Sequence, residues 1–199
     1  MKRARGRPRQ YDEEIALQAA GQVFWTKGFS ATSLDDLSAA MGMNRPSIYR
    51  AFGDKEAVYR RALMQFCDGM EAAFERTMLA EGDIRKALSS FYREALTLYT
   101  GGEQPRGCMV MSTAVAAAAC HPAIRADLLN VIRGLDEKIA KRLQQASEAG
   151  QLGSSFDIAG RAAIAQSLLH SLSLRARAGE SHRQLTRMIN TGVEMIVSC

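Results

Sequence analysis

The sequence contains few of the residues that build metal centres, disulfide frameworks or membrane spans. It has three histidines and four cysteines among 199 residues, and no two cysteines form a CxxC pair. The longest stretch without a charged residue or histidine, residues 107–120, is too short to cross a bilayer. The basic N-terminus has no apolar segment typical of a signal peptide. We therefore expect no metal, no cofactor and no membrane association, with reduced thiols in the cytoplasm.

Catalytic motifs are also missing. No P-loop, GxGxxG, HExxH or GxSxG pattern occurs. The histidines at 121, 170 and 182 have no serine, cysteine or carboxylate at a catalytic spacing, and Cys120 directly precedes His121 rather than standing at a metal-ligand spacing. We therefore expect the chain not to be an enzyme.

Glycine and proline are sparse, with 16 and four residues, and helix formers are abundant, which predicts an all-α fold. The net charge of +5 comes from one segment. Residues 1–10 hold five of the 26 basic residues and no acidic residue, which leaves 21 of each sign in the rest. We expect residues 1–10 to be a flexible basic arm beside a nucleic-acid-binding element, where release of counterions would favour binding.

This basic arm contains Arg5-Gly6-Arg7-Pro8, which resembles the core of an AT-hook. Arginines favour the narrow minor groove of A·T tracts, so Arg5 and Arg7 are candidate minor-groove contacts. The alternative is a basic leader that adds only non-specific attraction to DNA.

The pattern of residues 32–55 is typical of a helix-turn-helix. Thr32 and Ser33 are good helix caps, and Gly42 is placed to end the first helix. Asn44 can cap a second helix, which has Pro46 in its first turn. Two short helices joined by a glycine-containing turn predict a DNA-reading element.

The second of these helices has one apolar and one polar face. Ile48 and Phe52 stand four residues apart and are expected to be buried. The polar positions carry side chains that bond phosphates or base edges. A preceding helix over residues 12–27 is expected to bury Ile15 and Phe24, with Trp25 half-exposed.

The stretch from Thr32 to Lys55, read with Lys27-Gly28-Phe29 before it, resembles the DNA-binding domain of TetR/AcrR-family transcriptional regulators. The resemblance covers about residues 11–60. Two residues depart from the family pattern: Pro46 stands where a small residue such as glycine is usual, and Ala51 where histidine or another polar residue is common. Either departure can change which bases are read, and Ala51 can remove a phosphate contact.

The resemblance implies an all-α protein of about nine helices, with an N-terminal three-helix helix-turn-helix domain and a larger C-terminal helical bundle. The expected segments are a basic arm at 1–10, a DNA-binding domain at 11–54 and an effector-binding and dimerisation domain at 55–199. The implied function is a ligand-responsive repressor, a homodimer on a palindromic operator of double-stranded DNA, released by an unidentified small molecule. The alternatives are a DNA-architectural protein without effector sensing and a ligand-binding module that has lost its DNA function.

The expected DNA contacts divide into base readers and phosphate binders. Lys55 receives its phosphate role from the resemblance, and a lysine in the first turn of a helix is unfavourable for the dipole alone. The full expected set is Arg5, Arg7, Thr32, Ser33, Asn44, Arg45, Pro46, Ser47, Tyr49, Arg50 and Lys55.

The last two helices, near residues 156–178 and 181–197, carry apolar stripes that we interpret as a dimer interface, because the family dimerises through the corresponding helices. The alternative is that the stripes form only the core of a single chain. The interface set is Ile158, Ala165, Leu168, Leu169, Leu172, Leu185, Met188, Ile189, Gly192, Val193 and Ile196.

Helices are also expected near residues 55–79, 83–100, 107–120 and 122–149, with the third apolar almost all round and therefore enclosed. They would surround an effector pocket for an apolar or weakly polar ligand. Cys108, at the start of a helix and after Arg106, is also a candidate electrophile or oxidant sensor with a lowered pKa, the alternative being a small buried apolar residue. The candidate lining residues are Phe66, Met70, Phe74, Phe91, Leu98, Cys108, Met109, Met111 and His170. The alternative for each of them is a plain core residue, as Met and aromatic stripes usually are.

Overall fold

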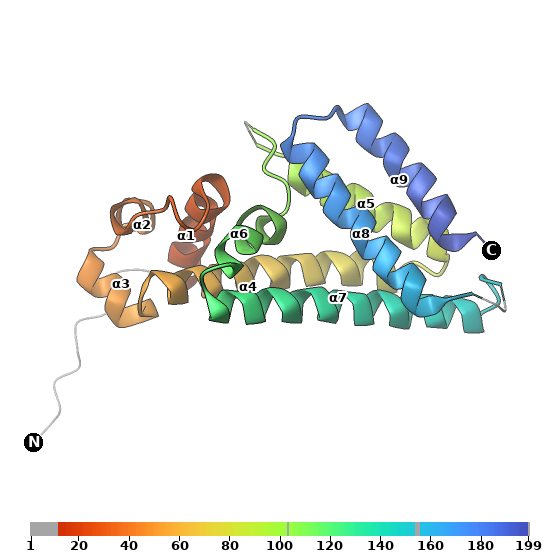
Figure 1. The fold of residues 1–199 in the computed structure, drawn as a ribbon, viewed down its shortest axis with the longest axis horizontal. Coiled ribbons are helices and arrows are strands. Elements are labelled where there is room, and N and C mark those ends of the chain that lie inside the picture. Colours follow the sequence, from red (N-terminus) through yellow and green to blue (C-terminus); the bar gives the residue numbers. More distant parts are fainter. Residues whose placement is uncertain (1–11, 103, 154–155, 199) are drawn as a thin grey trace, which may run out of the picture. The chain divides into compact units, whose positions relative to one another are not determined.

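The computed structural model describes residues 12–102, 104–153 and 156–198 (Figure 1). This part of the chain forms nine α-helices, two π-helical turns and no strand, which confirms the predicted all-α class. None of its helices is long and apolar enough to cross a membrane. The helices are α1 (Glu13–Lys27), α2 (Leu34–Met41), α3 (Arg45–Phe52), α4 (Lys55–Phe74), α5 (Ile84–Thr100), α6 (Val115–Ala118), α7 (Pro122–Glu148), α8 (Ile158–Arg177) and α9 (His182–Val197), and the π-helical turns are η1 (Glu75–Leu79) and η2 (Val110–Ala114).

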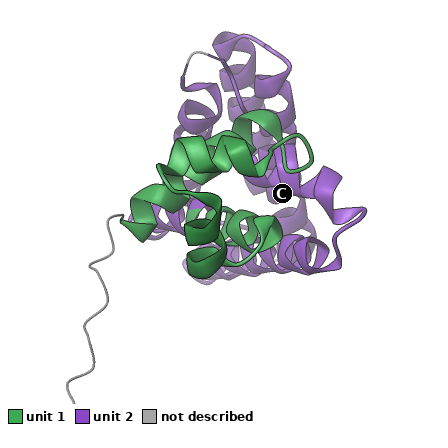
Figure 2. Cartoon of the chain, turned by 90° about the vertical axis from the view of Figure 1, so that its left-hand side faces the viewer, with its two compact units in different colours: residues 1–65 green, residues 66–199 purple. Residues whose placement is uncertain are grey.

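The helices form two compact units, which are coloured separately in Figure 2. The N-terminal unit ends at Gln65, and the C-terminal unit begins at Phe66. This division lies inside α4, whereas the sequence placed the boundary at residues 54 and 55, where α4 begins. One continuous helix therefore belongs to both units.

An aromatic cluster forms the centre of the N-terminal unit. Phe24 of α1 and Phe29 each pack edge-on against Tyr59 of α4, with 5.1 Å between ring centroids in both pairs. Trp25 is buried as well, although its position predicted a half-exposed side chain, and Ile15 is 66% exposed although it was expected in the core. The buried face of α1 is therefore rotated from the expected one.

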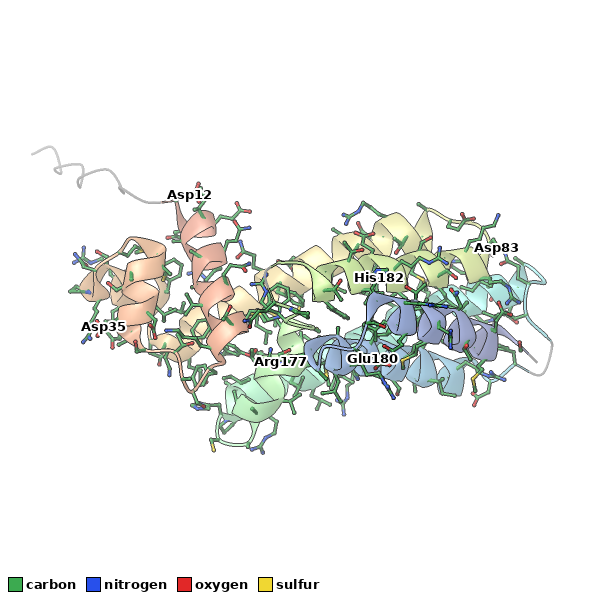
Figure 3. All side chains as sticks on the ribbon, turned by 90° about the horizontal axis from the view of Figure 1, so that it is seen from above. Asp12, Asp35, Asp83, Arg177, Glu180 and His182 are labelled. Carbon is green, nitrogen blue, oxygen red and sulfur yellow. The ribbon has the colours of Figure 1, made fainter. Side chains whose placement is uncertain are left out.

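Amphipathic helices build the C-terminal unit. Asp83, labelled in Figure 3, caps α5 by accepting a hydrogen bond from the backbone N–H of Lys86 at 2.9 Å. α5, α8 and α9 pack on one another, and α7 packs on α8 (Figure 1). Within this core the hydroxyl of Tyr92 in α5 donates to the carbonyl oxygen of Ala165 in α8 at 2.8 Å.

The apolar segment 107–120 is less enclosed than its composition predicted. It forms η2 and the short α6, and Val115 is 48% exposed although Met109 and Ala114 are buried. Cys120 is exposed too. The expectation of a fully enclosed helix is wrong, because more than half of a folded protein's accessible surface is apolar, so an apolar composition does not by itself specify burial.

The start of this segment is fixed against α8. The backbone N–H of Cys108 donates to the hydroxyl oxygen of Ser173 at 2.7 Å. Gly107 has φ +65°, and a Cβ added to it would lie 2.6 Å from the carbonyl oxygen of Ser173. A residue with a side chain would therefore clash with the α8 backbone at this turn.

A buried arginine closes the end of η1. Arg142 of α7 is 6% exposed, and its guanidinium donates to the backbone carbonyls of Met78, Glu81 and Gly82 at 2.7, 2.9 and 3.0 Å. The last carbonyls of a helix have no partner within it and carry its negative dipole end. Arg142 therefore supplies both hydrogen bonds and positive charge at this terminus.

Candidate functional site

Local hydrogen bonds set the geometry of α2. The hydroxyl of Ser33 accepts from the N–H of Asp36 at 3.1 Å, and the Asp36 carboxylate accepts from the N–H of Ser33 at 2.9 Å, which together form a capping box. Lys27 also donates to Asp36 at 2.6 Å. The Lys27 bond and then the Ser33 bonds lower the pKa of Asp36 from 3.8 to about 2.

The turn between α2 and α3 follows the predicted caps. Gly42 takes the left-handed conformation, with φ +62° and ψ +29°, and ends α2. Two residues later the side chain of Asn44 accepts from the N–H of Ser47 at 2.9 Å and starts α3, with Pro46 in its first turn. These residues end α2 and start α3 within a short turn.

The two faces of α3 divide as expected. Ile48 is fully buried and Phe52 is 5% exposed. Tyr49 is 50% exposed, Arg45, Pro46 and Arg50 are exposed, and Ser47 is half-buried. Four of the five predicted contacts on this helix therefore point to solvent, and they form a surface with two cations, a phenol and an apolar ring.

The side chain of Arg45 is held by an ion pair. Its guanidinium binds both carboxylate oxygens of Asp35 at 2.7 Å, and its Nε donates to the same group at 3.0 Å. Asp35, labelled in Figure 3, lies in the first turn of α2, so this ion pair joins the two helices. No local signal in the sequence indicated that Asp35 would orient Arg45.

Thr32 does not have the place that its expected phosphate contact requires. It is 1% exposed, and its hydroxyl donates to the carbonyl oxygen of Gly28 at 2.7 Å. The expectation that Thr32 reaches a phosphate is therefore wrong for this conformation. Its neighbour Ser33 is the cap and is exposed.

Lys55 has the partner that its unfavourable helix position indicated. Its ammonium donates to the carbonyl oxygens of Phe29 and Thr32 at 3.1 and 3.0 Å, and it lies 4.5 Å from the centroid of the Phe29 ring. Lys55 thus links the start of α4 to the loop before α2. An ammonium has three N–H donors, so the predicted phosphate contact would use the third. Arg5 and Arg7 lie outside the described residues.

The predicted dimer interface is largely the core of the chain itself. Seven of its eleven residues are at most 4% exposed within one chain, because the apolar stripes of α8 and α9 face their own unit. Their assignment to an outward interface is wrong. These residues are Ala165, Leu169, Leu172, Leu185, Ile189, Val193 and Ile196. The other four, Ile158, Leu168, Met188 and Gly192, are half-buried.

Other apolar residues of α8 and α9 are exposed. Ile164 is 53% exposed and Met195 is 66% exposed. The two helices approach closely beside them, since a Cβ added to Gly192 would lie 2.5 Å from Cδ2 of Leu168. The helices meet again at their turn, where Arg175 pairs with Glu180 at 2.9 Å. Figure 3 labels Glu180 at this junction.

The predicted pocket residues differ in burial. Phe74 and Phe91 form an edge-on pair at 5.5 Å in the core, and Met109 is 1% exposed. Leu98 is 39% exposed, so its assignment to a pocket is wrong: it lies on the solvent side of α5. Phe66, Met70, Met111 and His170 are half-buried.

Cys108 lacks the chemistry expected of a sensor. The residue is 8% exposed, and burial raises the pKa of its thiol above the ordinary value. A lowered pKa was expected from the helix dipole and Arg106, but the loss of hydration outweighs such effects in this environment. Burial likewise raises the pKa of Cys67 to about 12. Cys108 therefore corresponds to the alternative, a small buried residue.

Sequence reasoning missed a group of polar side chains inside the C-terminal unit. Buried oxygens of Asp136 in α7 and Gln166 in α8 have no hydrogen-bond partner. Burial lowers the pKa of His170, one turn after Gln166, and the Asp136 carboxylate acts against this effect. Asp136 belongs to a helix with many surface charges, so nothing in its spacing distinguished it from an exposed residue.

Two protein families match the chain. Residues 16–62 match the bacterial regulatory proteins of the tetR family, and residues 85–191 match the tetracyclin repressor-like C-terminal domain. The first range contains α2 and α3, and the second begins in α5 and ends in α9.

Individual proteins are similar over most of the chain. The HTH-type transcriptional repressor ComR of Escherichia coli K12 is 27% identical over 200 residues, which cover 98% of this chain and 93% of ComR. The HTH-type transcriptional repressor BdcR of the same organism is 31% identical over 109 residues, 55% of each chain. A solved structure of a cysteine-substituted TetR-family regulator, CifR, complexed with 26-bp operator DNA, has a TM-score of 0.88 at 28% identity and covers 94% of this chain and 98% of its own.

Proposed function

The chain belongs to the tetR family of bacterial regulatory proteins, which are DNA-binding regulators rather than enzymes, and from this we propose that it is a sequence-specific repressor whose operator binding is controlled by a small molecule. The observation that carries the proposal is the exposed surface of α3. A side-chain cap holds the start of α3, and an ion pair links Arg45 to α2, so this surface is oriented before DNA binds.

Within this surface we assign different tasks to different side chains. Arg45 and Arg50 would approach base edges in the major groove, with Ser47 beside them and Pro46 in apolar contact with a base. Ser33, Tyr49 and the third N–H of Lys55 would contact phosphates and set the register.

A homodimer would provide two such surfaces. One small helix-turn-helix buries too little area for specific binding, and dimers use two half-sites about one helical turn apart. The half-buried and exposed apolar residues of α8 and α9 support pairing into a four-helix bundle. Sedimentation of Ile164→Glu against wild type tests this: the dimer should dissociate, whereas Leu129→Glu, at an exposed leucine of α7, should leave it intact.

Effector binding in the C-terminal unit would favour a dimer whose α3 helices no longer match the half-site spacing. For a 100-fold release the effector must prefer that form by about 2.7 kcal/mol. α4 supports this coupling, because it is one helix that belongs to both units.

Footprinting of purified protein on its own upstream DNA over a salt series tests the function. We expect a discrete palindromic footprint near physiological salt, and diffuse protection that disappears with salt would instead favour an architectural protein that uses only its basic arm. Arg50→Ala should weaken the operator complex by about 5- to 150-fold and relax its sequence preference. Arg133→Ala, an exposed arginine of α7, is the matched control and should leave the footprint unchanged.

A further inference from the structure

Two buried hydrogen-bond acceptors in the C-terminal unit lack donors. They are Oδ1 of Asp136 in α7 and the side-chain oxygen Oε1 of Gln166 in α8. Gln166 is 3% exposed as a whole residue. Buried polar atoms are nearly always paired, because an unpaired one loses its water without compensation. An exception therefore requires a physical reason.

The two acceptors belong to one region of the fold. α7 packs on α8, and the imidazole of His170 follows Gln166 by one helical turn. The carboxylate of Asp136 influences the pKa of His170, which places these two side chains near each other. Ile139 of α7 and Leu169 of α8, adjacent along the same helices, are 1% and 4% exposed. The polar atoms therefore lie at the edge of an apolar core.

Poor packing of the unit does not explain the missing partners. Gln151, after α7, uses both ends of its amide: the oxygen accepts from the N–H of Ile84 at 2.8 Å, and the nitrogen donates to the carbonyl of Gly82 at 2.9 Å. Ser173, two turns beyond Gln166 on α8, is also hydrogen-bonded. In the part of the chain that the structure describes, no other buried side-chain nitrogen or oxygen lacks a partner, so the lack of donors is specific to the Asp136 and Gln166 oxygens.

We propose that Asp136, Gln166 and His170 form the polar end of the effector site, and that its ligand is a small molecule with an apolar body and a hydrogen-bond donor, either a protonated amine or a hydroxyl. This rests on the proposed function, in which the C-terminal unit binds an effector. Both unpaired atoms are acceptors, so the ligand must donate. The carboxylate favours a cation and repels an anionic ligand.

The first test uses two glutamines of the same unit. Gln166→Met keeps the shape of the side chain and removes the unpaired oxygen, so the full chain without ligand should melt about 2 °C or more above wild type. Gln151→Met is the contrasting control: Gln151 is exposed but hydrogen-bonded, so this variant should melt below wild type because it breaks two hydrogen bonds. A fall in Tm for Gln166→Met would overturn the proposal, since the oxygen would then be satisfied in solution by water alone or by the protein.

The second test uses three probes that share a 3-phenylpropyl body, at millimolar concentration: 3-phenylpropylamine, 3-phenylpropan-1-ol and the methyl ether of that alcohol. The amine and the alcohol should raise the Tm of wild type, and the ether, which has no donor, should not. The carboxylate should give the amine a larger Tm shift than the alcohol, and Asp136→Asn should abolish this difference. Equal shifts for all three probes, or no shift with any of them, would reject a donor-selective site.

Neither melting test involves DNA. Failure of the proposed function, seen as the lack of a discrete footprint, is therefore distinguishable from failure of this site. If the site exists, Gln166→Met should bind the operator like wild type but should resist release by any compound that stabilises the wild-type chain.

Discussion

Two regions of the molecule, the α2–α3 pair and the end of η1, stabilise their polar groups over different distances along the chain. In the N-terminal unit the caps of α2 and α3 join residues three apart, as in the pairs Ser33–Asp36 and Asn44–Ser47. In the C-terminal unit the bonds from Arg142 span 60 to 64 residues. The helices α2 and α3 are thus set mainly by local chemistry, whereas the end of η1 depends on contacts with a distant helix. Four substitutions test this difference, from the largest expected effect to the smallest.

Arg142→Met should have the largest effect. It removes three hydrogen bonds, and of the three carbonyls that of Gly82 keeps another donor, the amide of Gln151. At about 1 kcal/mol for each of the other two carbonyls we expect a loss near 2 kcal/mol, or roughly 4–8 °C in Tm. Calorimetry of the full chain measures this loss. Arg133→Met, an exposed arginine on the same helix, is the control and should melt with wild type. Similar melting of both variants would show that the long-range bonds of Arg142 contribute little.

Lys55→Met tests the long-range link within the N-terminal unit. It keeps the aliphatic stem and removes the ammonium that binds two carbonyls, so we expect a loss of about 1–2 kcal/mol in stability. DNA binding measured over a salt series separates the second role. A slope of log K against log salt concentration that decreases by about one phosphate contact supports the phosphate prediction. An unchanged slope leaves Lys55 with a purely structural role.

Ser33→Ala tests a local cap. Removal of the hydroxyl from the capping box should cost about 1 kcal/mol of stability in the N-terminal unit. Hydrogen exchange of the first amides of α2 measures the change directly. Ser30→Ala, an exposed serine in the preceding loop, should leave exchange unchanged. Equal exchange in the two variants would mean that tertiary packing alone holds α2.

As the pH falls, the C-terminal unit should lose stability at a higher pH than the N-terminal unit, and the loss should be small. Burial lowers the pKa of His170 below 6.5, so the unfolded chain takes up the proton first and stability falls as the pH falls through 6.5. The stability that Asp36 contributes is instead lost between its ordinary pKa of 3.8 and about 2. Between pH 7.5 and 5.5, wild type should therefore lose about 1–2 °C more in Tm than His170→Gln. Parallel curves would contradict a role for His170.

These distances explain what could be predicted from sequence. Gly42, Asn44 and the Ile48–Phe52 face were predicted correctly, because their structural reasons lie within one helical turn. The burial of Thr32 and the pairing of Arg45 with Asp35 were missed, since both depend on where other segments pack.

The stripes of α8 and α9 show a second limit. Periodicity indicates that one face of a helix is buried, but it does not say against which chain. Ile189 and Leu185 have the pattern of an interface, yet they pack inside a single chain. Asp136 and Gln166 show the same limit for polar residues, because the sequence does not say whether a carboxylate or amide oxygen will be buried.

The turn at Gly107 limits which substitutions this fold can tolerate. Gly28 and Gly42 have no atoms within 4 Å of an added Cβ, so a replacement there meets only an unfavourable backbone angle. At Gly107 the obstacle is the α8 backbone at Ser173, which no second side-chain substitution can remove. In a saturation mutagenesis library, variants at 107 should therefore be depleted more strongly than variants at 42, and suppressors that restore them should move α8 rather than substitute residue 173.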